Sequence, residues 1–257
     1  MQSERASGRR RPRRLVATAF AAVLAVAAVA GAVVAGMAPS AVSGHATEVA
    51  SSSSSRPLRI MPLGTSSTVG GGSPRTAGFR GPLEALLTRD GIAFDMVGSQ
   101  HSGPPSVPDL DHEGHGGWTM TRMQPLVAGW VSAARPDVIL LQVGTNDLLS
   151  GVSAAATAQR LDTMLATFRS VSPASVVVAG VWAPLPTRAA ARAAYTPLAT
   201  DVVRRHRARG EAVTFMDAAT VLRTGDLFDG LHPDAAGYRK IAALWERQIS
   251  STRTAAR

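Results

Sequence analysis

Five short apolar runs recur between residues 58 and 216, and Ala-rich stretches separate them. We predict strands at residues 58–63, 94–97, 137–143, 175–181 and 213–216. The third run reads Asp-Val-Ile-Leu-Leu-Gln-Val and is almost continuously apolar between a proline and a glycine. A strand that is apolar on both faces must be covered on both faces, which is typical of a parallel sheet.

The stretches between these runs have helical patterns, and another helical pattern follows the last run. Helices are expected at about residues 81–89, 121–134, 154–171, 189–209 and 234–249. Strand and helix alternate without an internal repeat, which predicts one α/β domain. We expect a three-layer α/β/α sandwich around a five-stranded parallel sheet, with the flavodoxin-like strand order 2-1-3-4-5.

The N-terminal part has a different composition. Six of the first 14 residues are arginine, and the 24 residues at 15–38 carry no charge. A basic segment before an apolar stretch is typical of an export signal, yet this stretch is also long enough to span a bilayer. We therefore predict a cleaved export signal or an uncleaved anchor. Either one places the body outside the cytoplasm, secreted or tethered to the outer face of the cell membrane.

These changes in composition divide the chain into four parts. The export signal or anchor occupies residues 1–38, a Ser-rich linker 39–56, the folded domain 57–252 and a short tail 253–257. The linker contains five consecutive serines and is too polar to join a core.

Net charge at first suggests a nucleic-acid or membrane-surface partner, because the chain carries +9. The N-terminal arginine cluster accounts for +5 of this charge and orients the export segment. From Arg56 onward, 21 basic and 16 acidic residues leave only +5. We predict no nucleic-acid partner, and membrane contact only through an uncleaved N-terminal segment. The absence of cysteine excludes disulfides, thiolate metal sites and a cysteine nucleophile.

Polar residues directly follow two of the predicted strands. Ser66 lies in Gly-Thr-Ser-Ser-Thr after the first strand, and Asn146 lies in Gly-Thr-Asn-Asp after the third. The carboxyl ends of parallel strands meet at one edge of a sheet, where sites form. A serine hydroxyl can act there as a nucleophile, and an asparagine amide can donate to a developing oxyanion. Each motif alone also fits a turn or a helix cap.

A carboxylate and a histidine precede the last predicted helix, in Asp229-Gly-Leu-His232-Pro. At this spacing the carboxylate can reach the imidazole Nδ1, which leaves Nε2 free to take a serine proton. Asp226 is a second, more distant candidate acid. As an isolated motif, Asp-x-x-His also fits a turn with a surface histidine.

The long connection after the second strand contains Asp-His-Glu-Gly-His-Gly-Gly-Trp at residues 111–118. Its histidines and carboxylates leave open a divalent metal site, although the spacing defines no complete ligand set. We favour the other interpretation, in which the glycines let backbone N–H groups approach a ligand closely. We expect no metal and no cofactor.

Together these motifs supply a nucleophile, a base, its orienting acid and oxyanion donors, which is what acyl transfer requires. In these motifs the sequence resembles the SGNH (GDSL-type) hydrolase family over residues 57–250. Its four blocks correspond to Ser66, a glycine of the 114–117 loop, Asn146 and His232. Further segments resemble the acetylxylan esterases of carbohydrate esterase family 3. They are Ile-Met-Pro-Leu-Gly at 60–64, Phe-Arg-Gly-Pro-Leu at 79–83, Val-Gly-Ser-Gln at 97–100 and the 111–118 segment.

The resemblance implies roles for individual residues. The triad would be Ser66, His232 and Asp229, and the oxyanion donors would be the amides of Ser66 and Gly117 and the side chain of Asn146. Two positions depart from the family pattern, since Thr65 replaces the Asp of Gly-Asp-Ser and Gly116 replaces a frequent Ser. The family Asp is not the triad acid, so the chemistry can survive.

We therefore expect a monomeric serine esterase that hydrolyses O-acetyl or other short-chain esters on polysaccharides, with Trp118 stacking on a sugar ring. Trp118 is equally suited to packing between the loop and the next helix. Two alternatives stay open: a short-chain lipid or ester hydrolase on the same scaffold, and a carbohydrate-binding protein whose catalysis is weakened at Thr65.

Overall fold

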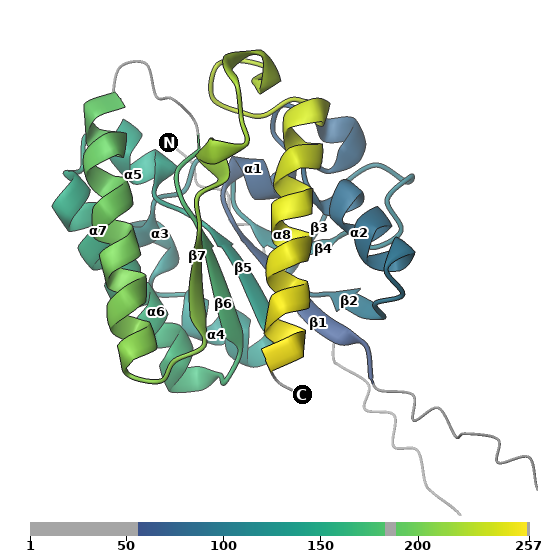
Figure 1. The fold of residues 1–257 in the computed structure, drawn as a ribbon, viewed down its shortest axis with the longest axis horizontal. Coiled ribbons are helices and arrows are strands. Elements are labelled where there is room, and N and C mark those ends of the chain that lie inside the picture. The colour runs from purple at the N-terminus through teal and green to yellow at the C-terminus, as the bar shows by residue number, and fades with distance from the viewer. Residues whose placement is uncertain (1–55, 183–188, 256–257) are drawn as a thin grey trace, which may run out of the picture. The chain divides into compact units, whose positions relative to one another are not determined.

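A computed structural model describes residues 56–182 and 189–255 of the chain (Figure 1). The expected export segment at 1–38 and all of the linker except its last residue lie outside these ranges, so their boundaries remain predictions. Within the described ranges, no helix is long and apolar enough to cross a membrane.

Five parallel strands form the centre of the fold, at nearly the predicted positions. They are β1 (Leu58–Gly64), β2 (Phe94–Met96), β5 (Val138–Gln142), β6 (Ser175–Ala179) and β7 (Val213–Met216). Their order is β2-β1-β5-β6-β7, which confirms the flavodoxin-like arrangement. All five residues of β5 are buried, as its apolar run predicts.

The prediction of exactly five strands is wrong, because the sheet has seven. β4 (Asp111–Gly114) runs parallel to the end of β1, and β3 (Gln100–His101) is antiparallel to β4. β2 pairs only with the first three residues of β1, which leaves the end of β1 free for β4. Both added strands are short and polar, so they lack the apolar run on which strand prediction depends.

Helices cover both faces of the sheet, which confirms the three-layer sandwich (Figure 1). α2 (Arg80–Arg89) packs against α8 (Ala235–Ala255) on one face. α6 (Ala154–Val171) packs against α7 (Ala189–Ala208) and α4 (Val127–Ala134) on the other. The crossover from β1 to β2 runs in the opposite direction along the sheet from the later ones. Right-handed crossovers therefore place its helix on the opposite face.

Shorter helical turns complete the domain. They are α1 (Ser66–Val69), α3 (Met120–Met123), α5 (Thr145–Leu149) and the 3₁₀ turns η1 (Pro74–Thr76), η2 (Ala218–Thr220) and η3 (Thr224–Asp226). The single helix expected at 121–134 is instead α3 and α4. Pro125 lies between them and cannot donate the hydrogen bond that a continuous helix needs. α8 continues through Ala255, three residues past the predicted end of the folded domain.

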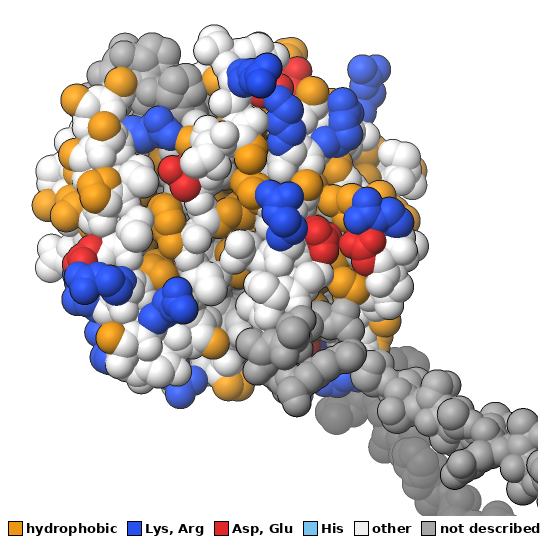
Figure 2. Space-filling model, in the orientation of Figure 1, with side chains coloured by type: hydrophobic (Ala, Val, Ile, Leu, Met, Phe, Trp, Pro, Cys, Tyr) orange, Lys and Arg blue, Asp and Glu red, His pale blue; other side chains and the backbone are white. Residues whose placement is uncertain are grey.

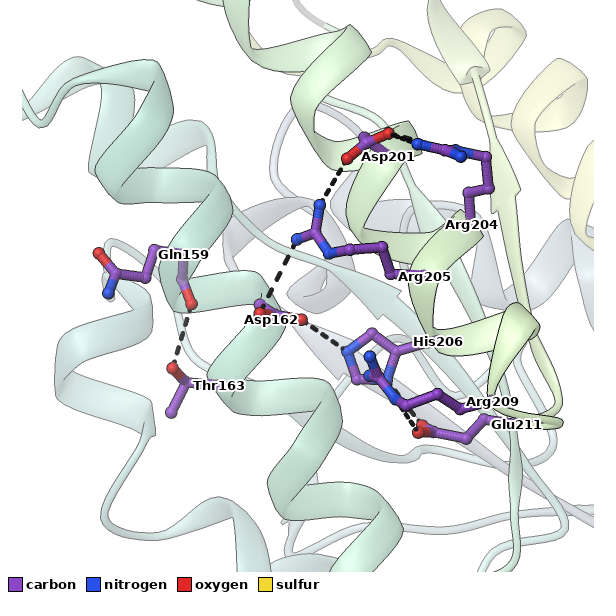
Figure 3. Close-up of polar contacts among 9 residues, drawn as sticks. All are labelled: Gln159, Asp162, Thr163, Asp201, Arg204, Arg205, His206, Arg209 and Glu211. Atoms are coloured by element: carbon purple, nitrogen blue, oxygen red, sulfur yellow. Dashed lines mark hydrogen bonds and ion pairs between the residues drawn. The ribbon is translucent and has the colours of Figure 1, made fainter.

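A buried histidine joins two helices of one face to the segment before the last strand. His206 of α7 is fully buried, with Nδ1 2.6 Å from Glu211 Oε2 and Nε2 2.9 Å from Asp162 Oδ1 (Figure 3). Both ring nitrogens therefore face carboxylate oxygens, one on α6 and one in the segment before β7. The neighbouring Arg205 and Arg209 pair with the same two carboxylates.

Surface charge on the described domain is mixed. On the face that carries α7 and α8, Lys and Arg side chains are scattered with Asp and Glu among them, without one continuous basic stripe (Figure 2). On that face the side chains therefore do not form the continuous basic patch that is typical of a nucleic-acid interface.

Candidate active site

Ser66 is the first residue of α1, directly beyond the end of β1. The connection between strand and helix is tight, because a Cβ on Gly64 would lie 2.4 Å from the carbonyl oxygen of Gln142. Thr65, the departure from the family pattern, is buried, and its hydroxyl donates to Gln142 Oε1 at 3.0 Å. The Thr65 side chain therefore ties the turn that carries Ser66 to the end of β5.

A continuous hydrogen-bond chain links Ser66 to the two residues predicted to act with it. Ser66 Oγ lies 2.7 Å from His232 Nε2, and His232 Nδ1 lies 2.7 Å from Asp229 Oδ2. A carboxylate only accepts hydrogen bonds, so Nδ1 carries the proton and Nε2 accepts from the serine hydroxyl. This is the tautomer that a general base for Ser66 requires.

The Asp229 carboxylate is held in its ionised form. Its Oδ1 accepts from the amides of His232 at 2.7 Å and Leu231 at 3.0 Å. Partial burial opposes ionisation, but these two bonds and the His232 ring outweigh it and lower the pKa of Asp229 to about 2. The carboxylate can therefore orient the imidazole and stabilise its charged form at neutral pH.

The loop that carries Asp229 and His232 is closed where its two ends meet. Leu227 and Pro233 form an antiparallel bridge, and the amide of Phe228 donates to the carbonyl of His232 at 2.8 Å. The second candidate acid, Asp226, has a structural partner instead: both its oxygens lie 2.7 Å from Lys240 Nζ. Asp226 therefore fixes the start of the loop on α8 and leaves the contact with His232 to Asp229.

A glycine run beside the histidine is a part of the site that the motifs did not indicate. A Cβ on Gly71 would lie 2.8 Å from His232 Cδ2, and one on Gly72 would lie 2.4 Å from the Pro233 carbonyl oxygen. Tyr238 of α8 holds this segment by donating to the Gly71 carbonyl at 2.6 Å. The Gly-Gly-Gly run at 70–72 was the available sequence signal, because such a run permits close backbone approach.

Arg80 is a second element of the site that sequence reasoning did not assign. It is fully buried, and its guanidinium donates to four carbonyls: Thr68 at 3.0 Å, Val69 at 3.2 Å, Ser102 at 2.6 Å and Leu110 at 3.1 Å. Burial lowers its pKa to about 10, against the opposing effect of nearby carboxylates. Arg80 thus ties α1, which begins at Ser66, to both ends of the connection between β3 and β4.

The predicted oxyanion loop is a turn from His115 to Trp118. The Trp118 amide donates to the His115 carbonyl at 3.3 Å, and Gly117 has φ 77° at the third position. Only glycine takes this conformation without strain, as in a type II turn. A Cβ on Gly116 would lie 3.9 Å from Ser66 Cβ, so the turn passes next to Ser66. Among the described residues, the Gly117 amide has no hydrogen-bond partner.

Asn146 lies at the start of α5, directly after β5, and is joined to the same turn. Its Nδ2 donates to the Trp118 carbonyl at 2.8 Å. A primary amide has two N–H donors, so one remains for a ligand after this bond is made. The structure therefore brings Asn146 to the loop of Gly116 and Gly117.

Two side chains lie against the Trp118 ring. His115 stacks on the ring with centroids 4.4 Å apart, and the Arg122 guanidinium carbon lies 3.9 Å from the ring centroid. Stacking of Trp118 on a sugar remains a prediction, and it requires Arg122 to move away first. In the described contacts, Trp118 packs between His115 of the loop and Arg122 of α3, which was the other expected role.

The two histidines of the 111–118 segment have separate partners. Buried His112 accepts from the Gly114 amide at 2.9 Å and faces Ser102 Oγ at 2.7 Å, while His115 Nε2 lies 2.7 Å from Glu113 Oε1. Burial, together with nearby cationic groups, lowers the pKa of His112 to about 3. Within the described residues, no three potential metal ligands form a cluster.

Comparison with known proteins shows the family to which this chain belongs. Residues 63–240 match the GDSL-like Lipase/Acylhydrolase family. A family 3 carbohydrate esterase from Clostridium thermocellum is 34% identical, with a TM-score of 0.70 over 79% of this chain and 100% of its own. One from Talaromyces cellulolyticus is 25% identical, with a TM-score of 0.67 over 76% and 97%.

A multidomain esterase from Ruminococcus flavefaciens is 29% identical over 233 residues. The match covers 77% of this chain but only 29% of that protein, so the chain spans less than a third of this relative. The family match itself extends over more than half of the chain and includes Ser66 and His232. The chain therefore belongs to the GDSL-like lipase/acylhydrolase family, and its described domain is a carboxylic ester hydrolase of that family.

Proposed function

We propose that this protein is an exported serine esterase that removes O-acetyl and other short-chain acyl groups from polysaccharides. The observation that carries the proposal is the chain from Ser66 Oγ through His232 to Asp229, with both links at 2.7 Å. The carbohydrate substrate is supported by similarity to family 3 carbohydrate esterases, which share the complete domain.

In the first half-reaction, Ser66 Oγ attacks the ester carbonyl carbon while its proton passes to His232 Nε2. Asp229 accepts from Nδ1 and stabilises the imidazolium that results. The tetrahedral intermediate collapses, the C–O bond to the sugar breaks, and the departing alkoxide takes the proton from Nε2. The acetyl group remains on Ser66 as an acyl-enzyme.

Negative charge on the former carbonyl oxygen is stabilised by three N–H donors. We assign them to the Ser66 amide, the Gly117 amide and Asn146 Nδ2, because the three residues meet at the end of β1. Such donors act strongly because they are oriented before the reaction begins. In the second half-reaction His232 deprotonates water, which attacks the acyl-enzyme and releases acetate.

An exposed aromatic residue lies beside the proposed triad. The side chain of Phe228 is 73% exposed and directly precedes Asp229 in the loop. An aromatic face that is open to solvent can pack against a sugar ring. We include Phe228 as a sugar contact, alongside Trp118 if Arg122 is displaced.

Export is part of the proposal and is supported by sequence alone. The basic and apolar segments at 1–38 would direct the domain out of the cytoplasm, cleaved or as an anchor. Fractionation of cells that produce the full chain tests this: activity in the medium or on the outer surface is expected, and activity retained in the cytoplasm would contradict it.

Acetate release from a panel of acetylated polysaccharides tests the substrate, with the Ser66→Ala protein as the control. We expect release by the unaltered protein and none by the variant, with equal far-UV circular dichroism. A chain-length series of p-nitrophenyl esters should decline from acetate upward. Faster turnover of long acyl chains would favour a lipid hydrolase, and sugar binding without ester turnover would favour a carbohydrate-binding protein.

A further inference from the structure

A second histidine–carboxylate pair lies beneath the oxyanion loop, outside the proposed triad. The ring of His115 stacks on Trp118 and on Trp130, with centroid distances of 4.4 and 4.6 Å, and the two tryptophan rings are themselves 6.3 Å apart. Its Nε2 lies 2.7 Å from Glu113 Oε1, and 11% of the His115 side chain is exposed. The imidazole is therefore held by two aromatic rings and, along one edge, by the Glu113 carboxylate.

The carboxylate of this pair is itself held from the other side. Glu113 is fully buried in β4, and its oxygens accept from the amide of Ser99 at 2.7 Å and from the Ser99 hydroxyl at 2.8 Å. A buried Glu–His pair costs desolvation that an apolar side chain of similar size would avoid. An orienting role, which needs a directional bond, explains the pair better than filling of the core.

The backbone of His115 belongs to the oxyanion loop itself. Its amide donates to the Gly64 carbonyl at 2.9 Å, at the end of the strand that leads to Ser66. Its carbonyl accepts from the Trp118 amide and so closes the turn that contains Gly117. Movement of His115 would therefore change the position of the Gly117 amide relative to Ser66.

The same residue also acts on the third proposed donor, through its neighbour in the stack. Trp118 supports one face of the His115 ring, and the Trp118 carbonyl accepts from Asn146 Nδ2 at 2.8 Å. The orientation of the Asn146 amide thus depends on where Trp118 lies. This pair is therefore connected, through the turn and through Trp118, to both proposed donors that Ser66 does not supply.

We propose that His115, held by Glu113, is a positioning residue that sets the Gly117 amide and the Asn146 amide at the oxyanion. This inference rests on the proposed function, since it assigns the residue that orients the same site. His115 does not touch the reacting atoms, and its effect is exerted through the turn and through Trp118.

Three single variants separate the hydrogen bond from the stack. His115→Phe keeps an aromatic ring against the two tryptophans and removes the bond to Glu113. Glu113→Gln keeps an acceptor oxygen but removes the charge, and it serves as the conservative replacement. His101→Phe is the matched control, because His101 forms a 2.6 Å pair with Asp111 at an exposed position in β3.

With p-nitrophenyl acetate we expect kcat of His115→Phe to fall about 10- to 100-fold while KM changes less than about two-fold, since displaced donors lose transition-state stabilisation. Glu113→Gln should retain more activity than His115→Phe. The double variant should be no slower than His115→Phe alone, because both act through one contact. His101→Phe should keep kcat within about two-fold.

A boronic acid inhibitor provides a readout that a general loss of stability would not move. It adds to Ser66 Oγ, the boron becomes tetrahedral with one hydroxyl at the oxyanion position, and the serine proton passes to His232. Its affinity for His115→Phe should fall by about the same factor as kcat, while binding of an uncharged substrate-like ester should change little. Retained kcat and boronate affinity in His115→Phe would overturn the proposal, as would a loss shared equally by the His101→Phe control.

Failure of the proposed function would be recognised separately. In that case the unaltered protein would release no acetate and Ser66 would not react with the boronate, whatever residue stands at 115. An active unaltered protein with an equally active His115→Phe variant would refute only the positioning role.

Discussion

The unaltered domain should lose stability as the pH rises, because buried Glu84 must ionise. Replacement of Glu84 by glutamine should remove this loss. Glu84 lies on α2 and is 3% exposed. One carboxyl oxygen accepts from the Asp109 amide at 3.3 Å, and the other has no hydrogen-bond partner within the described part of the chain. Burial, and to a smaller extent Asp109, raises the pKa of Glu84 to about 7, although the Asp109 amide and Arg80 act in the opposite direction.

The sign of the effect follows from proton binding. The folded state binds this proton more tightly than the unfolded state, in which the pKa is 4.5. The resulting stabilisation is present below about pH 4.5 and is lost as the pH rises through about 7. At about 1.4 kcal/mol for each tenfold change in proton affinity, the loss between pH 5 and pH 8 is about 2 to 3 kcal/mol.

Urea unfolding at pH 5 and pH 8 measures this difference. Glutamine does not ionise, so Glu84→Gln should gain about 2 to 3 kcal/mol of unfolding free energy relative to the unaltered protein between these pH values. Asp90→Asn is the control, because exposed Asp90 at the end of the same helix has a pKa lowered by Arg89. Its difference from the unaltered protein should stay constant over this range.

Two results would refute this reasoning. A difference for Glu84→Gln that stays within about 0.5 kcal/mol would mean that Glu84 ionises normally in the folded state. A decrease in the stability of Glu84→Gln relative to the unaltered protein between pH 5 and pH 8 would mean that the ionised carboxylate is stabilised by Arg80 more than burial opposes it.

Three further substitutions test other contacts. Gly71→Ala places a methyl group 2.8 Å from His232 Cδ2 and should lower kcat about 10- to 100-fold, whereas Gly129→Ala, with open space at its Cβ, should not; equal rates for both would contradict the close packing. Asp229→Asn should lower kcat by about 10³ to 10⁴ with p-nitrophenyl acetate, and a loss under tenfold would argue for another orienting acid. His206→Gln removes a fully buried ring that contacts both Glu211 and Asp162 and should cost about 2 kcal/mol in urea unfolding; a cost below about 0.5 kcal/mol would show that these two contacts contribute little.

Most of the fold follows from periodicity in the sequence. The apolar runs fall within two residues of the ends of β1, β2, β5, β6 and β7, and the helix at 154–171 agrees with α6 at both ends. β3 and β4 escaped prediction because their residues are polar, and they form through pairing with the free end of β1. A strand that forms because a neighbouring strand has an unpaired edge need not show an apolar pattern in its own residues.

The site divides in a similar way. Ser66 follows the first strand, and Asp229 and His232 lie in the loop before Pro233 and the last helix. These positions in the sequence predicted that the three residues lie close together at one edge of the sheet. Arg80 donates only to backbone carbonyl groups. Every residue has such a group, so the sequence does not indicate which residues Arg80 contacts. The pairing of His115 with Glu113 was equally hidden, because the same histidines and carboxylates also suggest a metal site until their separate partners are known.

The central claim is that Ser66 is the nucleophile, and covalent labelling tests it most directly. A fluorophosphonate should form one phosphorus–oxygen bond to Ser66 Oγ with loss of fluoride, which intact mass spectrometry and peptide mapping detect. We predict a single adduct on Ser66, loss of p-nitrophenyl acetate turnover in proportion to labelling, and no adduct in Ser66→Ala. An adduct on another residue, or full turnover by the Ser66→Ala protein, would contradict the account.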